Sequence, residues 1–285
     1  MEPTIRPAAE EDAAECGRIL YAAFQTLADR HGFPRDFPSV EAATEVAGFL
    51  LGDPAFAGFV AEAEGRILGS NFMHLGPPIA GIGPISVDPA AQDRGVGRRL
   101  MLAAMARAEM DGLAGVRLAQ TAYHNRSLCL YTRLGFRTRA ALSLMQGKPP
   151  RVTLPGYDVR PATAADLPAC NRLCHDVHGF DRGGELRAAI ARDTAVVVEH
   201  LGRITGYATA IGFFAHAVGE TNRDVTALIG AAAAFEGPGF LVPTENHELF
   251  AWCLDHGLRL VMQMNLMSTG LYAEPAGAWL PSVLY

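Results

Sequence analysis

The sequence predicts a mixed α/β protein made of two tandem copies of one fold, and three observations support this prediction. Strand-like and helix-like segments alternate through the first half of the chain, a pattern typical of domains in which helices pack on a central sheet. A β-rich segment passes through a glycine turn directly into a helix at 85–100. The chain has 285 residues, the length of about two domains, and its N-terminal segment reappears at 159–172.

The elements of the first copy are predicted from periodicity and turn residues. Helices are expected where apolar residues recur every three or four positions, as at Leu100, Ala104 and Ala108. Strands are expected where short apolar runs end in turn residues such as Gly65. In chain order the predicted elements are a strand opening at Ile5, helices at 12–27 and 40–51, strands at 58–62, 67–74 and 82–87, a helix at 97–110 and a strand at 116–121.

The glycine turn has the composition of a phosphate-binding loop. Gly95 and Gly97 lack a Cβ, so the backbone between Gln92 and Arg98 can curl tightly and direct consecutive N–H groups at one anion. The helix that follows adds the partial positive charge of its N-terminus, and Arg98 and Arg99 add formal charge. The segment therefore predicts a pyrophosphate site, and a purely structural turn without a ligand is the alternative.

The residues around the turn resemble the coenzyme A loop of the GNAT N-acetyltransferases. The family's strand, valine, proline, glutamine and paired glycines are matched by Val87, Pro89, Gln92, Gly95, Gly97 and Leu100. The resemblance implies a GNAT fold with acetyl-coenzyme A as co-substrate, its pyrophosphate held by backbone donors of 94–98 and its pantetheine arm paired with 85–87. The cofactor-binding residues expected from it are Ile85, Ser86, Val87, Gln92, Asp93, Arg94, Gly95, Val96, Gly97, Arg98, Asn125 and Tyr131.

A second motif at 125–136 also resembles the family. Asn125 suits a helix N-cap and Gly135 a position just beyond a helix C-terminus. The resemblance implies that Tyr131 lies beside the thioester sulfur and protonates the departing thiolate. A phenol with a pKa of about 10 is protonated at neutral pH and can fill this role. A core tyrosine on an amphipathic helix is the alternative for Tyr131, and a plain N-cap is the alternative for Asn125.

An internal repeat defines the predicted domains. Residues 5–18 reappear as 159–172, and 65–69 and 125–131 reappear as 202–206 and 246–252. We expect a catalytic domain at 1–147, a linker at 148–156 and a degenerate GNAT-like domain at 157–285. The second copy lacks the paired glycines at 219–225, and Trp252 is expected at the tyrosine's position. We therefore expect the second copy to bury apolar surface, to shape the acceptor pocket or to form a homodimer contact.

Composition limits the partners and the compartment. A net charge of −6 argues against nucleic acid, and no apolar run reaches the length of a membrane span. Five cysteines without a framework spacing, and an N-terminus without a secretory pattern, predict reduced thiols and a cytoplasmic location. No metal is expected. The cluster Cys170, Cys174, His175 and His178 has helical spacing, but Cys170 repeats Cys16, which lacks such neighbours.

These observations predict an N-acetyltransferase that moves an acetyl group from acetyl-coenzyme A to a primary amine of a small molecule or peptide. The alternative is a non-catalytic protein that binds or senses acyl-coenzyme A. The general base stays open among His74, His124 and a water chain, because the strand before the glycine turn carries no glutamate. The loop expected to face the acceptor, or else to be a solvated loop, contains Asp29, Arg30, His31, Phe33, Asp36 and Phe37.

Overall fold

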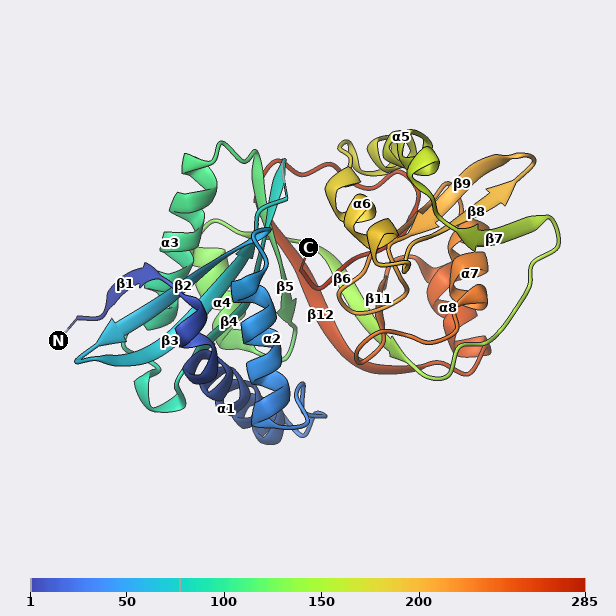
Figure 1. The fold of residues 1–285 in the computed structure, drawn as a ribbon. Coiled ribbons are helices and arrows are strands. Elements are labelled where there is room, and N and C mark those ends of the chain that lie inside the picture. The colour runs from blue at the N-terminus through green and yellow to red at the C-terminus, as the bar shows by residue number, and fades with distance from the viewer. Residues whose placement is uncertain (1, 77, 285) are drawn as a thin grey trace. The chain divides into compact units, whose positions relative to one another are not determined.

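The computed structural model describes residues 2–76 and 78–284, and the chain divides into two compact units (Figure 1). Unit 1 covers the chain up to Arg137, together with Ser268–Leu271 and Leu284. Unit 2 covers Thr138–Met267 and Tyr272–Val283. Each unit contains helices packed on strands, which confirms the predicted mixed α/β fold. The repeat boundaries at 147 and 157 stay a prediction.

Unit 1 is built on a sheet with the strand order β1-β2-β3-β4-β5, followed by the end of β12. The pairs from β1 to β4 are antiparallel, and β4 and β5 are parallel. The Leu271 N–H donates to the Ala114 carbonyl at 2.8 Å, just before β5. The bounds are β1 (Thr4–Pro7), β2 (Phe56–Ala63), β3 (Arg66–His74), β4 (Ile79–Val87), β5 (Gly115–Thr121) and β12 (Arg259–Gly270).

Four helices cover this sheet, and their ends follow local rules. The hydroxyl of Ser39 accepts from the Ala42 N–H at 3.3 Å and caps the second helix, while the first ends at Gly32 with a φ of 71°. A core that includes Cys16, Leu50 and Phe72 joins these two helices to the sheet. The bounds are η1 (Glu10–Asp12), α1 (Ala13–His31), α2 (Val40–Gly52), η2 (Pro89–Ala91), α3 (Val96–Met110) and α4 (Asn125–Arg133).

Unit 2 has an antiparallel sheet with the order β13-β10-β9-β8-β7, and a further group in which β6 lies between β11 and β12. Phe240 and Leu249 are among the fully buried side chains of its core. The strands are β6 (Arg137–Gln146), β7 (Tyr157–Pro161), β8 (Val196–His200), β9 (Arg203–Ala208), β10 (Ala217–Gly219), β11 (Phe240–Pro243) and β13 (Ala278–Leu280). The helices are η3 (Ala164–Asp166), α5 (Leu167–His178), α6 (Gly183–Ala191), α7 (Asn222–Ala231) and α8 (His247–Asp255).

The repeat is visible in side-chain geometry. At the start of each unit an arginine Nε donates to a glutamate at 2.8 Å. The terminal nitrogens of that arginine donate to an aspartate, at 2.7 and 2.9 Å in unit 1 and at 2.9 and 2.8 Å in unit 2. A register shift falls next to the glutamate in both units. The residues are Arg6, Asp12 and Glu62 in unit 1 and Arg160, Asp166 and Glu199 in unit 2.

No helix within 2–76 and 78–284 is both long and apolar enough to cross a lipid bilayer.

Candidate cofactor and acceptor site

The parallel strands of unit 1 separate where a cofactor arm is expected. β4 pairs with β5 through Ile79, Ala80 and Gly81, and no pairing between the two is recorded over the described remainder, 82–87 and 118–121. A bulge bends β4 as well, because Asn71 pairs with Ile85 while Met73 pairs with Ile82. The β5-facing edge of 82–87 is therefore open to a ligand that carries amide groups.

The glycine turn leads into α3 and leaves the first N–H groups of that helix without a side-chain cap. Asp93 and Gly95 have φ angles of 66° and 77°, so the chain curls in the left-handed region immediately before the helix. Gly95 is the N-cap of α3, and no side chain caps it. Since the first N–H groups of a helix have no partner within it, those of 96–98 are directed at whatever lies beyond the turn.

Gly97 is not required by packing within the protein. A Cβ added there would meet Val87 Cγ2 at 3.6 Å and Leu130 Cδ2 at 3.7 Å, which are ordinary contacts. No left-handed φ holds this position to glycine either. The space beside this residue leaves room for a ligand to approach the backbone closely. Gly95 differs, because its φ of 77° disfavours other residues whatever the space.

Charged groups around the turn divide into two sets. Arg94 and Arg98 are exposed and form no ion pair with any residue that the structure describes. Arg126 on α4 instead donates to Gln92 Oε1 at 3.0 Å and to Asp93 Oδ1 at 2.5 Å. Gln92 and Asp93 therefore tie the loop to α4, while Arg94 and Arg98 are free to meet phosphate oxygens.

The Gln92 side chain also fixes the turn from the strand side. Its Nε2 donates to the Val87 carbonyl at the end of β4, at 3.2 Å. Sequence reasoning missed Arg126, which completes this clamp. Its partners precede it by 34 and 33 positions, so no local spacing marks it.

Tyr131 lies on α4, the helix whose Leu130 faces Gly97. It is 7% exposed, and its ring centroid lies 6.1 Å from that of Phe136. Burial raises the pKa of its phenol, so the hydroxyl stays protonated at neutral pH. Within the described part of the chain this hydroxyl has no hydrogen-bond partner, and its oxygen is not among the fully buried polar atoms without a partner. A protonated phenol whose hydroxyl is accessible can donate to a departing thiolate.

Other predicted residues take smaller roles or different positions. Asn125 is the exposed first residue of α4, and His124 is its N-cap, so the expectation that Asn125 caps the helix is wrong by one residue. The Ser86 hydroxyl is buried 3.2 Å from that of Ser70, so only the Ser86 backbone is left for a ligand. Ile85 and Val87 are half-buried.

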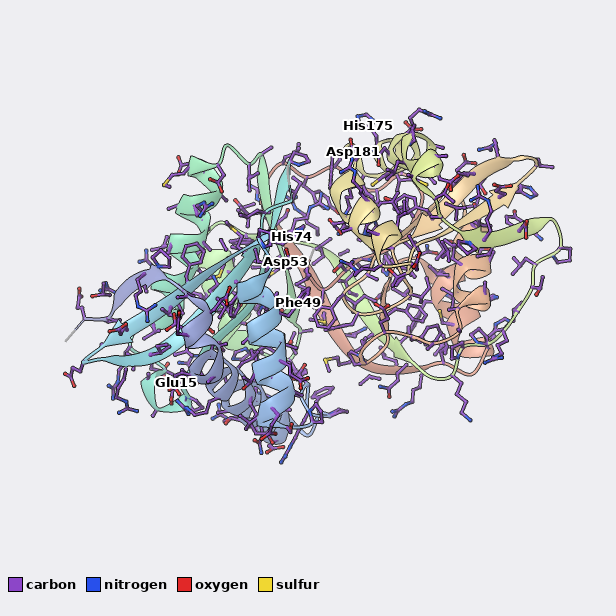
Figure 2. The ribbon with its side chains drawn as sticks, in the orientation of Figure 1. Glu15, Phe49, Asp53, His74, His175 and Asp181 are labelled. Carbon is purple, nitrogen blue, oxygen red and sulfur yellow. The ribbon has the colours of Figure 1, made fainter. Side chains whose placement is uncertain are left out.

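The two histidines considered as bases lie at different ends of β4. His74 ends β3 opposite Gly81, and its ring centroid lies 5.0 Å from that of Phe56, which in turn contacts Phe49 (Figure 2). Gly81 precedes Val87 by six residues, about 20 Å of strand. His124 directly precedes α4, and burial is the first cause that lowers its pKa, so its imidazole is neutral at neutral pH.

The loop between α1 and α2 packs on the residue that precedes His124. Phe33 stacks on Tyr123 with 4.0 Å between ring centroids and 6° between planes, and His31 lies 5.2 Å from the same ring. In the rest of the loop region, Phe37 contacts Phe24 at 5.6 Å between centroids, and both terminal groups of Asp29 accept from Arg35 at 3.1 Å. The aromatic side chains of the loop are therefore packed on unit 1, while Asp29, Arg30 and His31 are exposed.

Unit 2 closes both features that are open in unit 1. Its helix α7 begins at Thr221 with a capping box, in which Asp224 Oδ2 accepts from the Thr221 N–H at 2.9 Å and the Thr221 hydroxyl at 2.7 Å. The edge of β10 is paired with β13, where Val218 is opposite Trp279. The Asp224 carboxylate disfavours an anion at the start of α7, and β13 occupies the edge of β10 that an extended arm would need.

The counterpart of Tyr131 in unit 2 is Cys253, not Trp252. The N-caps His124 and Asn246 are 122 positions apart, so the two helices align with Tyr131 opposite Cys253. The predicted repeat instead paired 125–131 with 246–252, one residue away from this alignment. Bonds of 3.0 Å from the Phe136 N–H to the Tyr131 carbonyl and from the Leu258 N–H to the Cys253 carbonyl close both helices alike. Burial raises the pKa of the Cys253 thiol to about 12.

The cysteines and histidines of α5 serve packing. Cys170 and Cys174 are fully buried, and burial raises the pKa of both thiols. The His178 ring lies 5.5 Å from Trp279 in an edge-on contact. Over 2–76 and 78–284 no group of three or more His, Cys, Asp or Glu side chains is placed to hold a metal ion.

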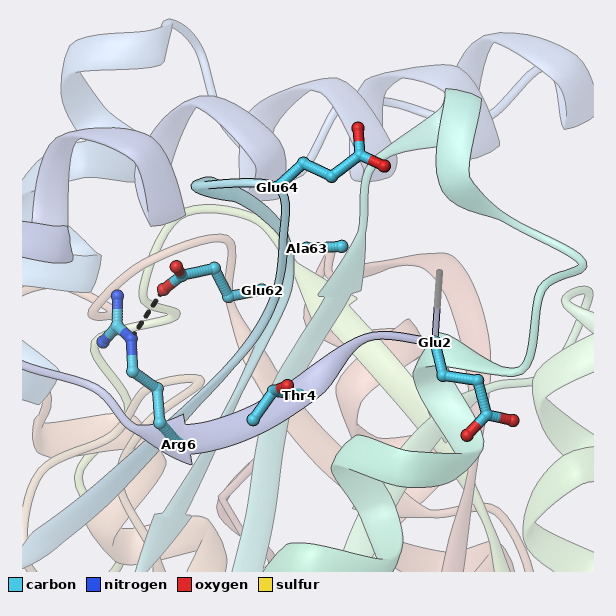
Figure 3. A pocket seen from close by; sticks show the side chains of 6 residues that line it. All are labelled: Glu2, Thr4, Arg6, Glu62, Ala63 and Glu64. Atoms are coloured by element: carbon cyan, nitrogen blue, oxygen red, sulfur yellow. Dashed lines mark hydrogen bonds and ion pairs between the residues drawn. The ribbon is translucent and has the colours of Figure 1, made fainter.

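A hollow of about 270 Å³ lies at the β1 edge of unit 1 (Figure 3). Arg6 and Glu62 form an ion pair within it, 2.8 Å from Nε to Oε2. Its acidic residues make it a poor site for a phosphate-bearing cofactor. The lining residues are Glu2, Thr4, Arg6, Glu62, Ala63 and Glu64.

Comparison with known proteins gives a family for the first unit. Residues 54–138 match the family model described as an acetyltransferase (GNAT) domain. A mycothiol acetyltransferase of Nocardia farcinica is 34% identical over 133 residues, 44% of this chain and 42% of that protein. One from Thermomonospora curvata is 38% identical over 99 residues, 34% of this chain and 33% of that protein. The chain thus spans less than half the length of these curated relatives.

Solved structures share the fold over almost the whole chain. A putative acetyltransferase from Pyrococcus horikoshii matches with a TM-score of 0.73 at 16% identity, over 98% of this chain and 94% of that one. A tandem GNAT protein from the clavulanic acid biosynthesis pathway matches with a TM-score of 0.57 at 14% identity, over 94% of this chain and 98% of that one. These matches confirm the predicted GNAT fold in tandem.

Proposed function

Because this chain is a GNAT superfamily member with two domains, we propose that unit 1 transfers an acetyl group from acetyl-coenzyme A to a primary amine. One observation carries the proposal: a helix N-terminus without a side-chain cap lies beside a helix that holds a buried, protonated Tyr131. The first part suits a pyrophosphate and the second a leaving thiolate.

The residues present fit acetyl-coenzyme A, which supplies an activated thioester when bound. The N–H groups of 96–98 donate to the pyrophosphate oxygens, and Arg94 and Arg98 neutralise its charge. The open edge of 85–87 offers backbone groups to the pantetheine amides. An N–H on this edge also polarises the thioester carbonyl and stabilises the charge that develops on its oxygen.

The reaction balances with groups of unit 1. The acceptor ammonium loses one proton to a base, and its nitrogen forms a bond to the acyl carbon while the carbon–sulfur bond breaks. Tyr131 donates its proton to the sulfur, and the second proton of the attacking nitrogen restores the phenol. The products are an amide, free coenzyme A and one released proton. His124 is neutral and is the N-cap of α4, the helix that carries Tyr131, which favours it over His74 as the first base to test.

The acceptor and the location follow from weaker observations. The curated relatives are mycothiol acetyltransferases by name, so a mycothiol-related amine is the first acceptor to try. Peptide amines and a homodimer stay predictions. We place the enzyme in the cytoplasm, because its five cysteines are all unpaired thiols.

Titration calorimetry with acetyl-coenzyme A, joined to an assay of thiol release, tests the proposal. We expect one binding site per chain, and we expect Tyr131→Phe to bind acetyl-coenzyme A normally while turnover falls ~100- to 10,000-fold. Cys253→Ala in unit 2 is the control and should leave turnover unchanged. Absence of binding would refute the cofactor site. Binding without turnover on any amine would favour the non-catalytic, acyl-coenzyme A binding alternative.

A further inference from the structure

The loop between α1 and α2 carries a half-buried carboxylate that lacks a cation. Asp36 has no ion pair or hydrogen bond with another residue in the described part of the chain. Asp29, near the end of α1, is different, because the Nε and Nη2 of Arg35 each donate to it at 3.1 Å. The basic residue next to Asp36 in sequence is therefore already occupied, which leaves Asp36 uncompensated.

The surroundings of Asp36 are aromatic. Tyr123 lies close enough for the Asp36 charge to contribute to its raised pKa of about 12, and Phe33 stacks on Tyr123 at 4.0 Å. Burial raises the pKa of Asp36 itself to about 6. At neutral pH the carboxylate is charged in an apolar setting, an arrangement that costs stability unless a positive group joins it. The Asp36 carboxylate oxygens are not fully buried, because neither is among the buried polar atoms that lack a partner.

The loop lies at the end of unit 1 where the chemistry is proposed. Tyr123 follows Thr121, the last residue of β5, by two positions and precedes Asn125, the first residue of α4, by two. His31, the last residue of α1, lies 5.2 Å from the Tyr123 ring between centroids, so the end of α1 also lies beside this junction. The strands β4 and β5 have separated before this end of β5. The loop that carries Asp36 thus packs at the end of unit 1 where the two strands have separated.

We propose that the carboxylate of Asp36 binds the ammonium group of the acceptor, with the Phe33–Tyr123 pair as an aromatic wall beside it. The inference rests on the proposed acetyl transfer and names its acceptor class: a cationic primary amine. An ammonium gains a charge-assisted hydrogen bond to the carboxylate and favourable contact with ring faces. A neutral analogue of the same shape gains neither and leaves the buried charge unpaired, so it binds weakly.

Calorimetric titration of the full-length protein in the presence of coenzyme A tests the proposal without turnover. The probes are 2-phenylethylamine, spermidine and glucosamine, with 2-phenylethanol as the neutral analogue. Asp36→Asn should weaken binding of the amines about tenfold or more, since it removes one charge-assisted contact. Asp111→Asn is the control, because it removes the same charge from unit 1 at a surface pair with Arg107. Both variants should have unfolding temperatures near that of the parent, which would show that any loss of amine binding does not come from unfolding.

The outcomes separate this inference from the proposed function. Equal affinity of the amines for Asp36→Asn and the parent would overturn the inference, as would failure of all three amines to bind the parent. Tighter binding of 2-phenylethanol than of 2-phenylethylamine would overturn it too. Amine binding that depends on Asp36, without thiol release, would support it while refuting acetyl transfer. Thiol release in which Asp36→Asn leaves the KM for the amine unchanged would support acetyl transfer and refute the role of Asp36.

Discussion

The two units place a helix after a strand in the same order, but they treat the helix N-terminus in opposite ways. In unit 1 the helix α3 begins at Gly95 without a side-chain cap. In unit 2 the N-cap of helix α7 is Thr221, and the Asp224 carboxylate in the first turn accepts from the N–H and the hydroxyl of Thr221. The start of α7 thus carries a carboxylate of the chain itself, at the place where a phosphate is proposed to bind in unit 1.

The joint between the first two helices shows the same contrast. Unit 1 has Asp36 without a cation, whereas in unit 2 Arg182 donates to both oxygens of Glu185, at 3.0 and 2.7 Å. His216 Nδ1 lies 3.2 Å from the same carboxylate, and its Nε2 lies 3.1 Å from the Tyr207 hydroxyl. The pKa of Glu185 is held well below its usual range and that of His216 is lowered to about 4. Unit 2 thus contains its own cation, while unit 1 leaves room for one.

The largest expected effect is on the free energy of unfolding, when the ion pair between Arg182 and Glu185 in unit 2 is broken. Glu185→Gln removes the charge that Arg182 faces, and the arginine side chain is only 5% exposed. Removal of one partner from a buried pair should lower the free energy of unfolding by about 3 kcal/mol. Urea unfolding measures this loss. Glu220→Gln is the control, because its pair with Arg203 is exposed and should contribute less than about 1 kcal/mol. Equal losses in the two variants would contradict a buried, paired role for Glu185.

A smaller effect sharpens the comparison of helix N-termini. Gly97 and Gly184 are each the second residue of a helix, α3 in unit 1 and α6 in unit 2, and neither has a neighbour that an added Cβ would strike. Alanine should keep or raise the unfolding temperature at both positions, because it is the better helix former. Only Gly97→Ala should weaken acetyl-coenzyme A binding, by about tenfold or more, measured by calorimetry. Unchanged affinity in Gly97→Ala would show that no ligand approaches this backbone.

The smallest effect concerns the pH dependence of stability in unit 1. The pKa of Asp36 is about 6 in the folded protein, against about 3.9 when unfolded. The folded state binds this proton more tightly, so stability that Asp36 contributes below pH ~4 is lost as the pH rises to ~6. The stability of the parent relative to Asp36→Asn should therefore fall between pH 4.5 and 7.5. The neighbouring Tyr123, with a pKa of about 12, stays protonated throughout. Urea unfolding at both pH values gives the difference, and a constant or rising one would contradict the prediction.

Local signals in the sequence predicted the frame of the molecule and the position of the turn. Gly95 and Gly97 stand where a helix begins, and the repeat of 5–18 at 159–172 marked two copies. The glycine turn and the repeat are both patterns of residues that are close together along the chain, so the sequence alone reveals them. The match of Trp252 to Tyr131 is wrong because the identical residues Asn125 and Asn246 suggest an alignment that differs by one residue from that of the helix N-caps, His124 and Asn246.

The rest of the site depends on contacts between distant segments. Arg126 meets a loop that precedes it by more than thirty residues, and β13 pairs with β10 from beyond α8. The importance of Asp36 lies in the absence of a partner, and a sequence cannot show which arginine is already engaged. The structure therefore adds two kinds of information to the sequence pattern: which charged side chains form ion pairs, and which strands pair along the edge of a sheet.

The end of β12 has a consequence for how the protein is made. Ser268–Leu271 belongs to unit 1 and lies next to β5, although most of the intervening chain belongs to unit 2. A ribosome adds ~5–20 residues per second, so β5 waits several seconds with an unpaired edge before its neighbour is synthesised. Such edges invite pairing with other chains. Unit 1 is therefore completed only after most of unit 2 has been translated, and its folding in the cell is coupled to that synthesis.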